Sequence, residues 1–184
     1  MVKTESQVFA IATLDGRLRV EFRRQQDRFA HRILLDQAEV ARSVEGDADE
    51  PWPDSPPLQQ LSLEEIKQSE TILAVGSAGR SHWSLSAQIE PDREAAASLR
   101  FDVAARCRDP RNHDIRSTYL AADSILVQPC EAEAIETTNG GGNWKRVSIR
   151  PAQATGSAAV EVNRPATVCW SYRIVVVDQR IVRH

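Results

Sequence analysis

The sequence predicts an all-β fold, an antiparallel β-sandwich with either jelly-roll-like or immunoglobulin-like topology. Apolar and polar residues alternate along many short segments, turn signals recur about every ten residues, and no strand–helix–strand alternation appears. A β-barrel would satisfy the same observations. The segment 166–177 favours the sandwich, because apolar residues occupy both of its faces near the end, as in a strand covered on both sides.

Residues 8–35 predict a three-stranded meander. Asp15-Gly16 is a strong hairpin signal, because both residue types tolerate a positive φ. In the next two strands, 17–23 and 28–35, alternate residues share a face, so one face of the meander is apolar. The predicted apolar positions are Leu18, Val20 and Phe22 in the first of these strands and Phe29, His31, Ile33 and Leu35 in the second.

The periodicity is lost from residue 38 to residue 61. The part from 43 to 58 is acidic and rich in proline, which lacks the N–H group that a sheet interior needs. We expect a long surface excursion, with a linker between domains as the alternative. Because a meander cannot bury both of its faces alone, we favour an excursion within one domain that covers residues 1–184.

One short helix is predicted near residues 62–69. Ser62 and Glu65 match the Ser-x-x-Glu capping box, in which two side chains satisfy free N–H groups at a helix start. A helix of this length is not stable alone, so it would have to pack on the sheet.

The clearest strand pair covers residues 83–89 and 99–107, where apolar residues occupy every second position. We predict that Trp83, Leu85, Phe101 and Val103 face the core. The other predicted elements are strands at 71–75, 124–128, 131–136 and 144–150, a weaker strand at 158–162, the strand at 166–177, a polar excursion at 108–117 and a glycine-rich hairpin loop at 139–143.

Composition restricts the classes of partner. A net charge of −3 gives no global attraction to nucleic acid or to an anionic membrane. The sequence shows no apolar segment typical of a signal peptide and no run long enough to span a bilayer. Cys107, Cys130 and Cys169 are widely separated, so we expect reduced thiols in a cytoplasmic protein, with one disulfide as the alternative.

The meander carries many arginines, which we call the arginine strip. Its candidate binding residues are Arg17, Arg19, Arg23, Arg28 and Arg32. On an outward face they would bind phosphates, acidic glycans or an acidic partner segment, or pair with the chain's own acidic stretch. The plain alternative is a charged surface that protects a sheet edge from aggregation. Nucleic acid is disfavoured, because few aromatic residues are available to stack on bases.

Two histidines are candidate site residues, and a third is predicted to belong to the core. His82 is a candidate at a sheet edge beside Trp83, and His113 is a candidate because Asp114 could orient its imidazole for acid–base chemistry. For His113 the alternative is a solvated loop, since adjacent residues on an extended loop point apart. His31 is predicted to be a satisfied core histidine rather than a metal ligand, because a metal needs three or four converging donors.

No catalytic motif is present: the sequence lacks Gly-x-Ser-x-Gly, His-Glu-x-x-His and the phosphate-binding loop. We therefore predict a non-catalytic binding or structural module that interacts with a protein partner, a second copy or an anionic ligand, with no cofactor, metal or membrane. The alternative is an enzyme, for example a hydrolase or a carbohydrate-active protein, with a site in the sandwich or barrel mouth formed by His82, His113 or Asp114.

Overall fold

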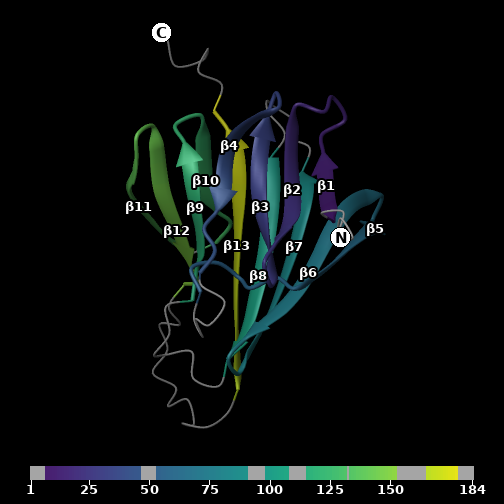
Figure 1. The fold of residues 1–184 in the computed structure, drawn as a ribbon, viewed down its shortest axis with the longest axis vertical. Helices are drawn as coiled ribbons and strands as arrows, with labels where there is room; N and C mark the ends of the chain where they lie inside the picture. The colour runs from purple at the N-terminus through teal and green to yellow at the C-terminus, as the bar shows by residue number, and fades with distance from the viewer. Residues whose placement is uncertain are drawn as a thin grey trace, which may run out of the picture.

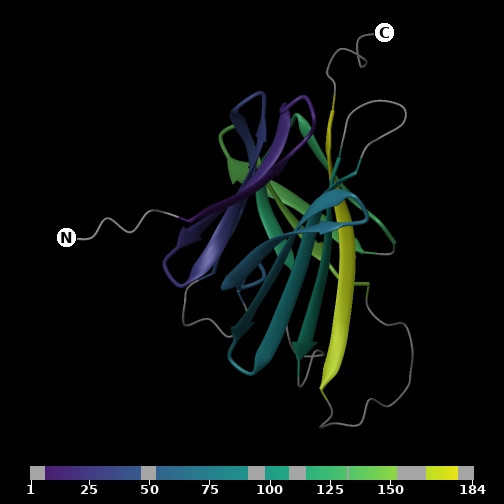
Figure 2. The ribbon, with the colours of Figure 1, turned by 90° about the vertical axis from the view of Figure 1, so that its right-hand side faces the viewer.

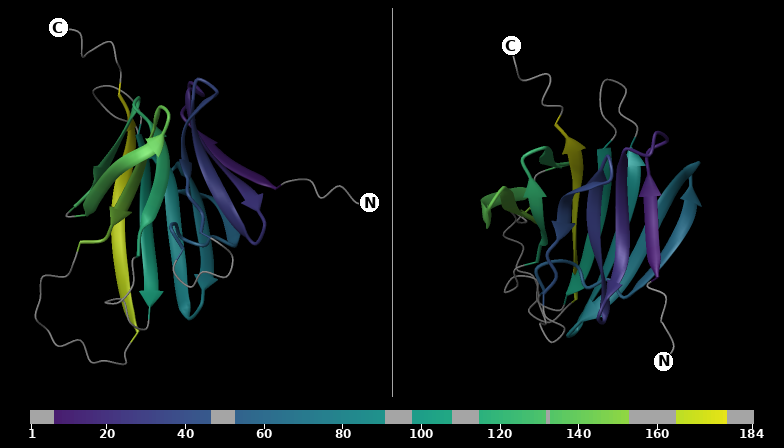
Figure 3. Two further views of the ribbon diagram at one scale, coloured as in Figure 1. Left: turned by 60° about the vertical axis from the view of Figure 1, so that its left-hand side comes forward. Right: turned by 45° about the horizontal axis from the view of Figure 1, so that its top comes forward.

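Two antiparallel sheets pack face to face in the computed structural model (Figures 1 and 2). The structure describes residues 7–46, 53–90, 98–107, 115–131, 133–152 and 165–177. These ranges contain thirteen strands and no helix. The predicted all-β sandwich is confirmed. Figure 3 shows the strands of both layers running in broadly similar directions, as in aligned sheet packing.

The first sheet has seven strands and begins with the predicted meander. The order β1-β2-β3 follows the chain, and the Asp15-Gly16 turn joins the first pair. The full order is β1 (Val8–Ala12), β2 (Leu18–Gln25), β3 (Arg28–Leu35), β4 (Ala38–Ser43), β9 (Ser117–Ala122), β12 (Trp144–Arg150) and β11 (Ala134–Gly141).

The second sheet has six strands, and its order is β10 (Ile125–Pro129), β13 (Ala166–Val176), β8 (Ser98–Cys107), β7 (Ser81–Glu90), β6 (Ser69–Ala78) and β5 (Gln60–Ile66). As predicted, the C-terminal strand β13 is an inner strand, since it pairs with β8 and β10. Only one of its faces is packed: Tyr172 and Ile174 are buried, while Val175 stays partly exposed. The prediction that this strand is covered on both faces is therefore wrong.

The core lies between the two sheets and follows the alternation of the strands. Trp83, Leu85, Phe101 and Val103 are each at most 3% exposed, as their period of two predicts. Trp83 meets Trp170 edge to face, with ring centroids 6.1 Å apart. The intervening residues of β7 and β8 face outward, so this register decides which side chains are available to a ligand.

The predicted helix at 62–69 is wrong. Residues 60–66 form β5, which turns through Lys67 and Gln68 and pairs with β6. Both turn residues have a positive φ, 51° and 68°. Pairing of Leu63 with Ile72 gives this segment a partner that an isolated capping box does not supply, so tertiary pairing outweighs the local helix signal.

The expected surface excursion is also partly wrong. Residues 38–43 form β4, and residues 53–59, which we call the crossover segment, pack against both sheets. Leu58 in this segment is only 1% exposed. Its carbonyl accepts the N–H of Phe29 at 2.7 Å, and Gln59 N–H donates to Val75 O at 2.8 Å. Proline lacks an N–H to satisfy, which suits this buried, irregular path.

Polar side chains anchor the start of the crossover segment. Ser55 Oγ accepts the N–H of Thr118 at 3.2 Å and donates to its carbonyl at 3.1 Å. Asp54 accepts hydrogen bonds from Arg116 and Arg146 on the seven-stranded sheet side. The predicted strand at 158–162 falls on residues outside the described ranges.

In the ranges that the structure describes, no helix has the length and apolar character needed to cross a membrane. Cys107 is buried, Cys130 is half-buried and Cys169 is exposed, and all three are free thiols.

Gly76 is where the crossover segment comes closest to β6. A Cβ atom added at Gly76 would overlap the carbonyl oxygen of Pro57. We expect Gly76→Ala to lower the free energy of unfolding by about 2 kcal/mol or more, because backbone has to shift on one side of the contact. Denaturant unfolding measures this change. Ser84→Ala, at an exposed position on β7, is the matched control and should leave stability within about 0.5 kcal/mol; equal losses would contradict the steric account.

Candidate functional site

The chain's own carboxylates neutralise the arginine strip. Glu21 accepts ion pairs from Arg19, Arg23 and Arg32 at 3.1, 2.9 and 2.8 Å, and its side chain is only 8% exposed. Arg17 pairs with Asp36 at 2.8 Å. Another anion would therefore have to compete with these carboxylates for the same guanidinium groups. Binding of a ligand or partner at the strip stays a prediction.

Arg28 does not belong to the open face of the meander. It is 3% exposed and pairs with Asp27 at 3.0 Å. The adjacent Phe29 N–H bonds to Leu58 O, so the crossover segment passes close to this end of β3. The strand parity of Arg28 predicts exposure, but packing at the end of the sandwich overrides it.

Glu21 is held ionised by its arginine partners. Burial alone would raise the pKa of this carboxyl, but hydrogen bonds from Arg32 and Arg23 outweigh it and leave the pKa below its ordinary value. The carboxylate therefore stabilises the fold above the pKa that it has in the unfolded chain. This contribution is lost as the pH falls through the lower pKa of the folded state.

His31 lies in the core, as predicted. Its Nε2 is 2.7 Å from the Tyr119 hydroxyl, which is 2.8 Å from the Tyr172 hydroxyl. The ring stacks on Phe22 with centroids 4.8 Å apart. Burial lowers the pKa of His31 to about 3, so the ring is neutral at ordinary pH. His31 is therefore part of the core and is not accessible to a ligand at the surface.

His82 lines a surface hollow at one end of the six-stranded sheet. Gly79 has a φ of 55°, which suits a two-residue hairpin turn, and this turn places Arg80 between β6 and β7. His82 on β7 is directly opposite Arg106 on β8. Directly opposite residues of an antiparallel pair project from the same face, so the two basic side chains are neighbours. Both residues are exposed.

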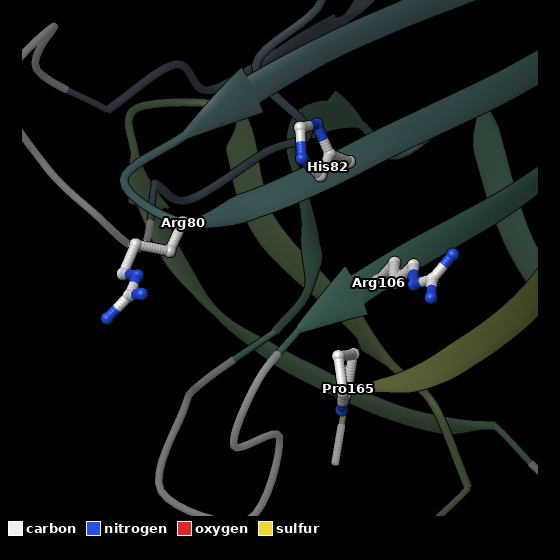
Figure 4. Close-up of a pocket in the computed structure, with 4 residues that line it drawn as sticks. All are labelled: Arg80, His82, Arg106 and Pro165. Atoms are coloured by element: carbon white, nitrogen blue, oxygen red, sulfur yellow. The ribbon is translucent and has the colours of Figure 1, made fainter. Parts of the chain in front are cut away.

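The hollow has a volume of about 470 Å³ and is lined by Arg80, His82, Arg106 and Pro165. Figure 4 shows His82 and Arg106 extending from adjacent strands, Arg80 from the turn and Pro165 just ahead of β13. None of these four residues is acidic. Among the described residues, the hollow therefore gathers positive charge on a chain whose net charge is negative.

Arg80 and Arg106 differ from the other arginines in the described ranges. Each of the others makes a hydrogen bond, an ion pair or a ring contact, whereas these two make none. Their guanidinium groups are exposed and make no hydrogen bond or ion pair with the described part of the protein. An external carboxylate or phosphate can bind them without displacing a protein group.

Sequence reasoning found His82 but missed Arg80 and Arg106. Their available signals were weak: Arg80 follows a turn glycine, and Arg106 occupies an outward position in a clearly alternating strand. Only the strand register places Arg106 opposite His82. His113 and Asp114 lie outside the described residues, so the enzyme hypothesis that uses them stays a prediction.

A second hollow, of about 370 Å³, lies at the β11–β12 hairpin and is lined by Asp123, Thr137, Thr138, Asn139, Gly142, Asn143, Trp144 and Lys145. Its one described ammonium group, that of Lys145, is paired with Asp123 at 2.6 Å. The described residues contain no cluster of three or more His, Cys, Asp or Glu able to hold a metal ion. The hollow beside His82 is therefore the stronger candidate.

Comparison of the chain with protein families, with curated proteins and with solved structures gave no significant match. Its function has to be inferred from the geometry of the site.

Glu21 provides a test of the internal pairing in the arginine strip. We expect Glu21→Gln to lower the free energy of unfolding by about 2 kcal/mol at pH 7, because three arginines lose a shared, largely buried anion. The difference from the wild type should shrink as the pH falls below 4.5, because the unfolded wild-type chain then gains a proton while the folded carboxylate, with its lowered pKa, still resists protonation. Denaturant unfolding at several pH values measures both effects.

Asp36→Asn, which removes the exposed pair with Arg17, is the matched control and should change stability by less than about 1 kcal/mol. A loss for Glu21→Gln that stays constant down to pH 3 would contradict the role of the ionised carboxylate.

Proposed function

We propose that this protein is a non-catalytic β-sandwich module that binds a small anionic ligand, bearing phosphate or carboxylate groups, in the hollow formed by Arg80, His82 and Arg106. The observation that carries the proposal is the pairing pattern of the arginines. Among the described residues, those without a protein partner are Arg80 and Arg106, and both line this hollow.

An anion binds more favourably at the hollow than at the arginine strip. At the strip an incoming anion meets Glu21, which repels it and already holds three guanidinium groups. At the hollow the anion displaces no carboxylate from Arg80 or Arg106, because neither guanidinium is paired with a described residue of the protein. A guanidinium presents parallel N–H donors that match two oxygens of a carboxylate or phosphate, and such charge-assisted bonds are stronger than neutral ones. The hollow is therefore the better anion site.

The size and openness of the hollow limit the ligand and its affinity. A volume of about 470 Å³ falls within the range of small-molecule sites. Because the three basic residues are exposed, water and salt weaken each ion pair, so we expect a dissociation constant on the order of 0.1–1 mM at low salt. A ligand with several anionic groups engages more of these residues than a single carboxylate does.

Titration with sodium tripolyphosphate in low-salt buffer, followed by isothermal calorimetry, tests the proposal. We expect the double variant Arg80→Ala/Arg106→Ala to weaken binding at least tenfold, because it removes both unpaired guanidinium groups. The wild-type affinity should also fall as salt is added. Both substitutions are at exposed positions, so the fold should be retained, and unfolding curves check this.

The double variant Arg17→Ala/Arg23→Ala is the matched control. It removes the same number of charges from the strip and should leave affinity within about twofold of the wild type, allowing for the small long-range effect of net charge. If this control loses binding and the hollow variant retains it, the ligand binds the strip and the proposal is wrong. Equal weakening by both variants would indicate non-specific attraction and would also overturn it.

A further inference from the structure

Glu45 places an acidic side chain at an enclosed position just after β4. Its Oε1 accepts a hydrogen bond from Ser43 Oγ at 2.5 Å, and the same hydroxyl oxygen accepts the N–H of His31 at 2.9 Å. Although Glu45 as a residue is half-buried, its Oε2 atom is enclosed and has no hydrogen-bond partner. An ionised carboxylate is poorly solvated in such a position, because one oxygen has neither water nor a donor.

The groups around Glu45 come from several elements. Arg28 on β3 attracts its negative charge, whereas Asp27 in the β2–β3 turn and Asp54 in the crossover segment repel it. The hydroxyls of Tyr119 on β9 and Tyr172 on β13 are also within electrostatic reach and are kept neutral by burial. His31, whose backbone shares Ser43 with Glu45, is neutral as well. Arg28 is therefore the one cation among these neighbours, and it already pairs with Asp27.

Burial raises the pKa of the Glu45 carboxyl to about 7, with smaller increases from Asp27 and Asp54. The folded chain therefore retains this proton at pH values where the unfolded chain, with a pKa near 4.5, has lost it. Stability that depends on the proton is present below pH 4.5 and is lost as the pH rises to about 7. His31 has the opposite sign, because its lowered pKa removes stability only as the pH falls.

Glu45 lies where three parts of the fold are joined by hydrogen bonds. The adjacent Val44 N–H donates to Thr118 O on β9 at 2.8 Å. Thr118 N–H in turn donates to Ser55 Oγ in the crossover segment at 3.2 Å. If Glu45 moved toward water, the adjacent Val44 would also be displaced. The hydrogen bond from Val44 to Thr118 would then weaken, and with it the contact between β9 and the crossover segment.

We propose that Glu45 is a pH-sensitive latch. As a neutral acid it stays enclosed beside Ser43, and the bonds that Val44, Thr118 and Ser55 make between β4, β9 and the crossover segment remain closed; when Glu45 gives up its proton to solvent it moves toward water and loosens these bonds. The released state exposes the carboxylate to water and leaves the remaining strands of both sheets paired. The latch is separate from the anion site, because none of its groups lines the hollow beside His82.

Amide hydrogen exchange of the full chain at pH 5.5 and pH 8.5 tests the latch. The reporters are the N–H groups of Phe29, Val44, Gln59 and Thr118, whose partners are identified above. At pH 8.5 we expect these amides to exchange at least tenfold faster in the wild type than in Glu45→Gln, which is neutral at every pH. At pH 5.5 the two proteins should exchange within about twofold of each other. Comparison at equal pH cancels the intrinsic pH dependence of exchange.

Glu39→Gln is the matched control, since Glu39 is on β4 and pairs with Arg42 near the surface at 3.3 Å. It should exchange like the wild type at both pH values. Equal rates for the wild type and Glu45→Gln at pH 8.5 would overturn the latch. The same protection from Glu39→Gln, or an equal change at the core amide of Val103 in β8, would also overturn it, because the effect would then be global.

Discussion

The alternation of side chains along paired strands is the constraint on which this structure depends. Each strand has one face that gains stability by leaving water, and two sheets satisfy this by packing their apolar faces together. Full burial of a side chain such as Phe101 or Ile174 contributes on the order of 1.5–3 kcal/mol, so a shift of register by one residue is strongly disfavoured. The same constraint leaves only outward positions and strand ends for ligand chemistry. His82 is available to a ligand and Trp83 is not, because neighbouring residues of a strand project from opposite faces of the sheet.

The sequence predicts the parts of the fold in which this alternation is strong. The meander β1–β3, the pair β7–β8 and the inner strand β13 have apolar residues at every second position, and the structure contains them as predicted. β4 and β9 were missed because their alternation is mixed with polar residues that the fold itself satisfies. Thr118, for example, is fully buried and bonds to Ser55, which is 63 residues away in the chain. The Ser62–Glu65 helix signal was misleading because it is local, whereas β5 is determined by its pairing with β6.

The candidate site was less accessible to sequence reasoning than the fold. A run of arginines predicts a cationic surface, yet Glu21 lies within that run and converts it into a network of internal ion pairs. The opposite holds at the hollow, where Arg80 and Arg106 are 26 residues apart in sequence but line one site, because the β6–β7 turn carries Arg80 and the β7–β8 register places Arg106 opposite His82. The number of arginines can be counted from the sequence, but whether each one is free to bind a ligand depends on its ion pairs within the protein. Those ion pairs depend on the strand register and on carboxylates far away in the sequence.

The pairing of β4 with β9 has a consequence for the order in which the chain can fold. Ser43 is opposite Tyr119, so the two strands meet only after the whole β5–β8 region has been made. During synthesis β4 forms the open edge of a three- or four-stranded meander, with unpaired N–H and C=O groups facing solvent. Contacts of such long sequence separation form slowly, because a long loop must close before they stabilise anything. The β4 edge that pairs with β9 in the folded sheet therefore has no native partner until residues 117–122 have been made. An edge of this kind can pair with a strand of another chain, so β9 also protects β4 from association.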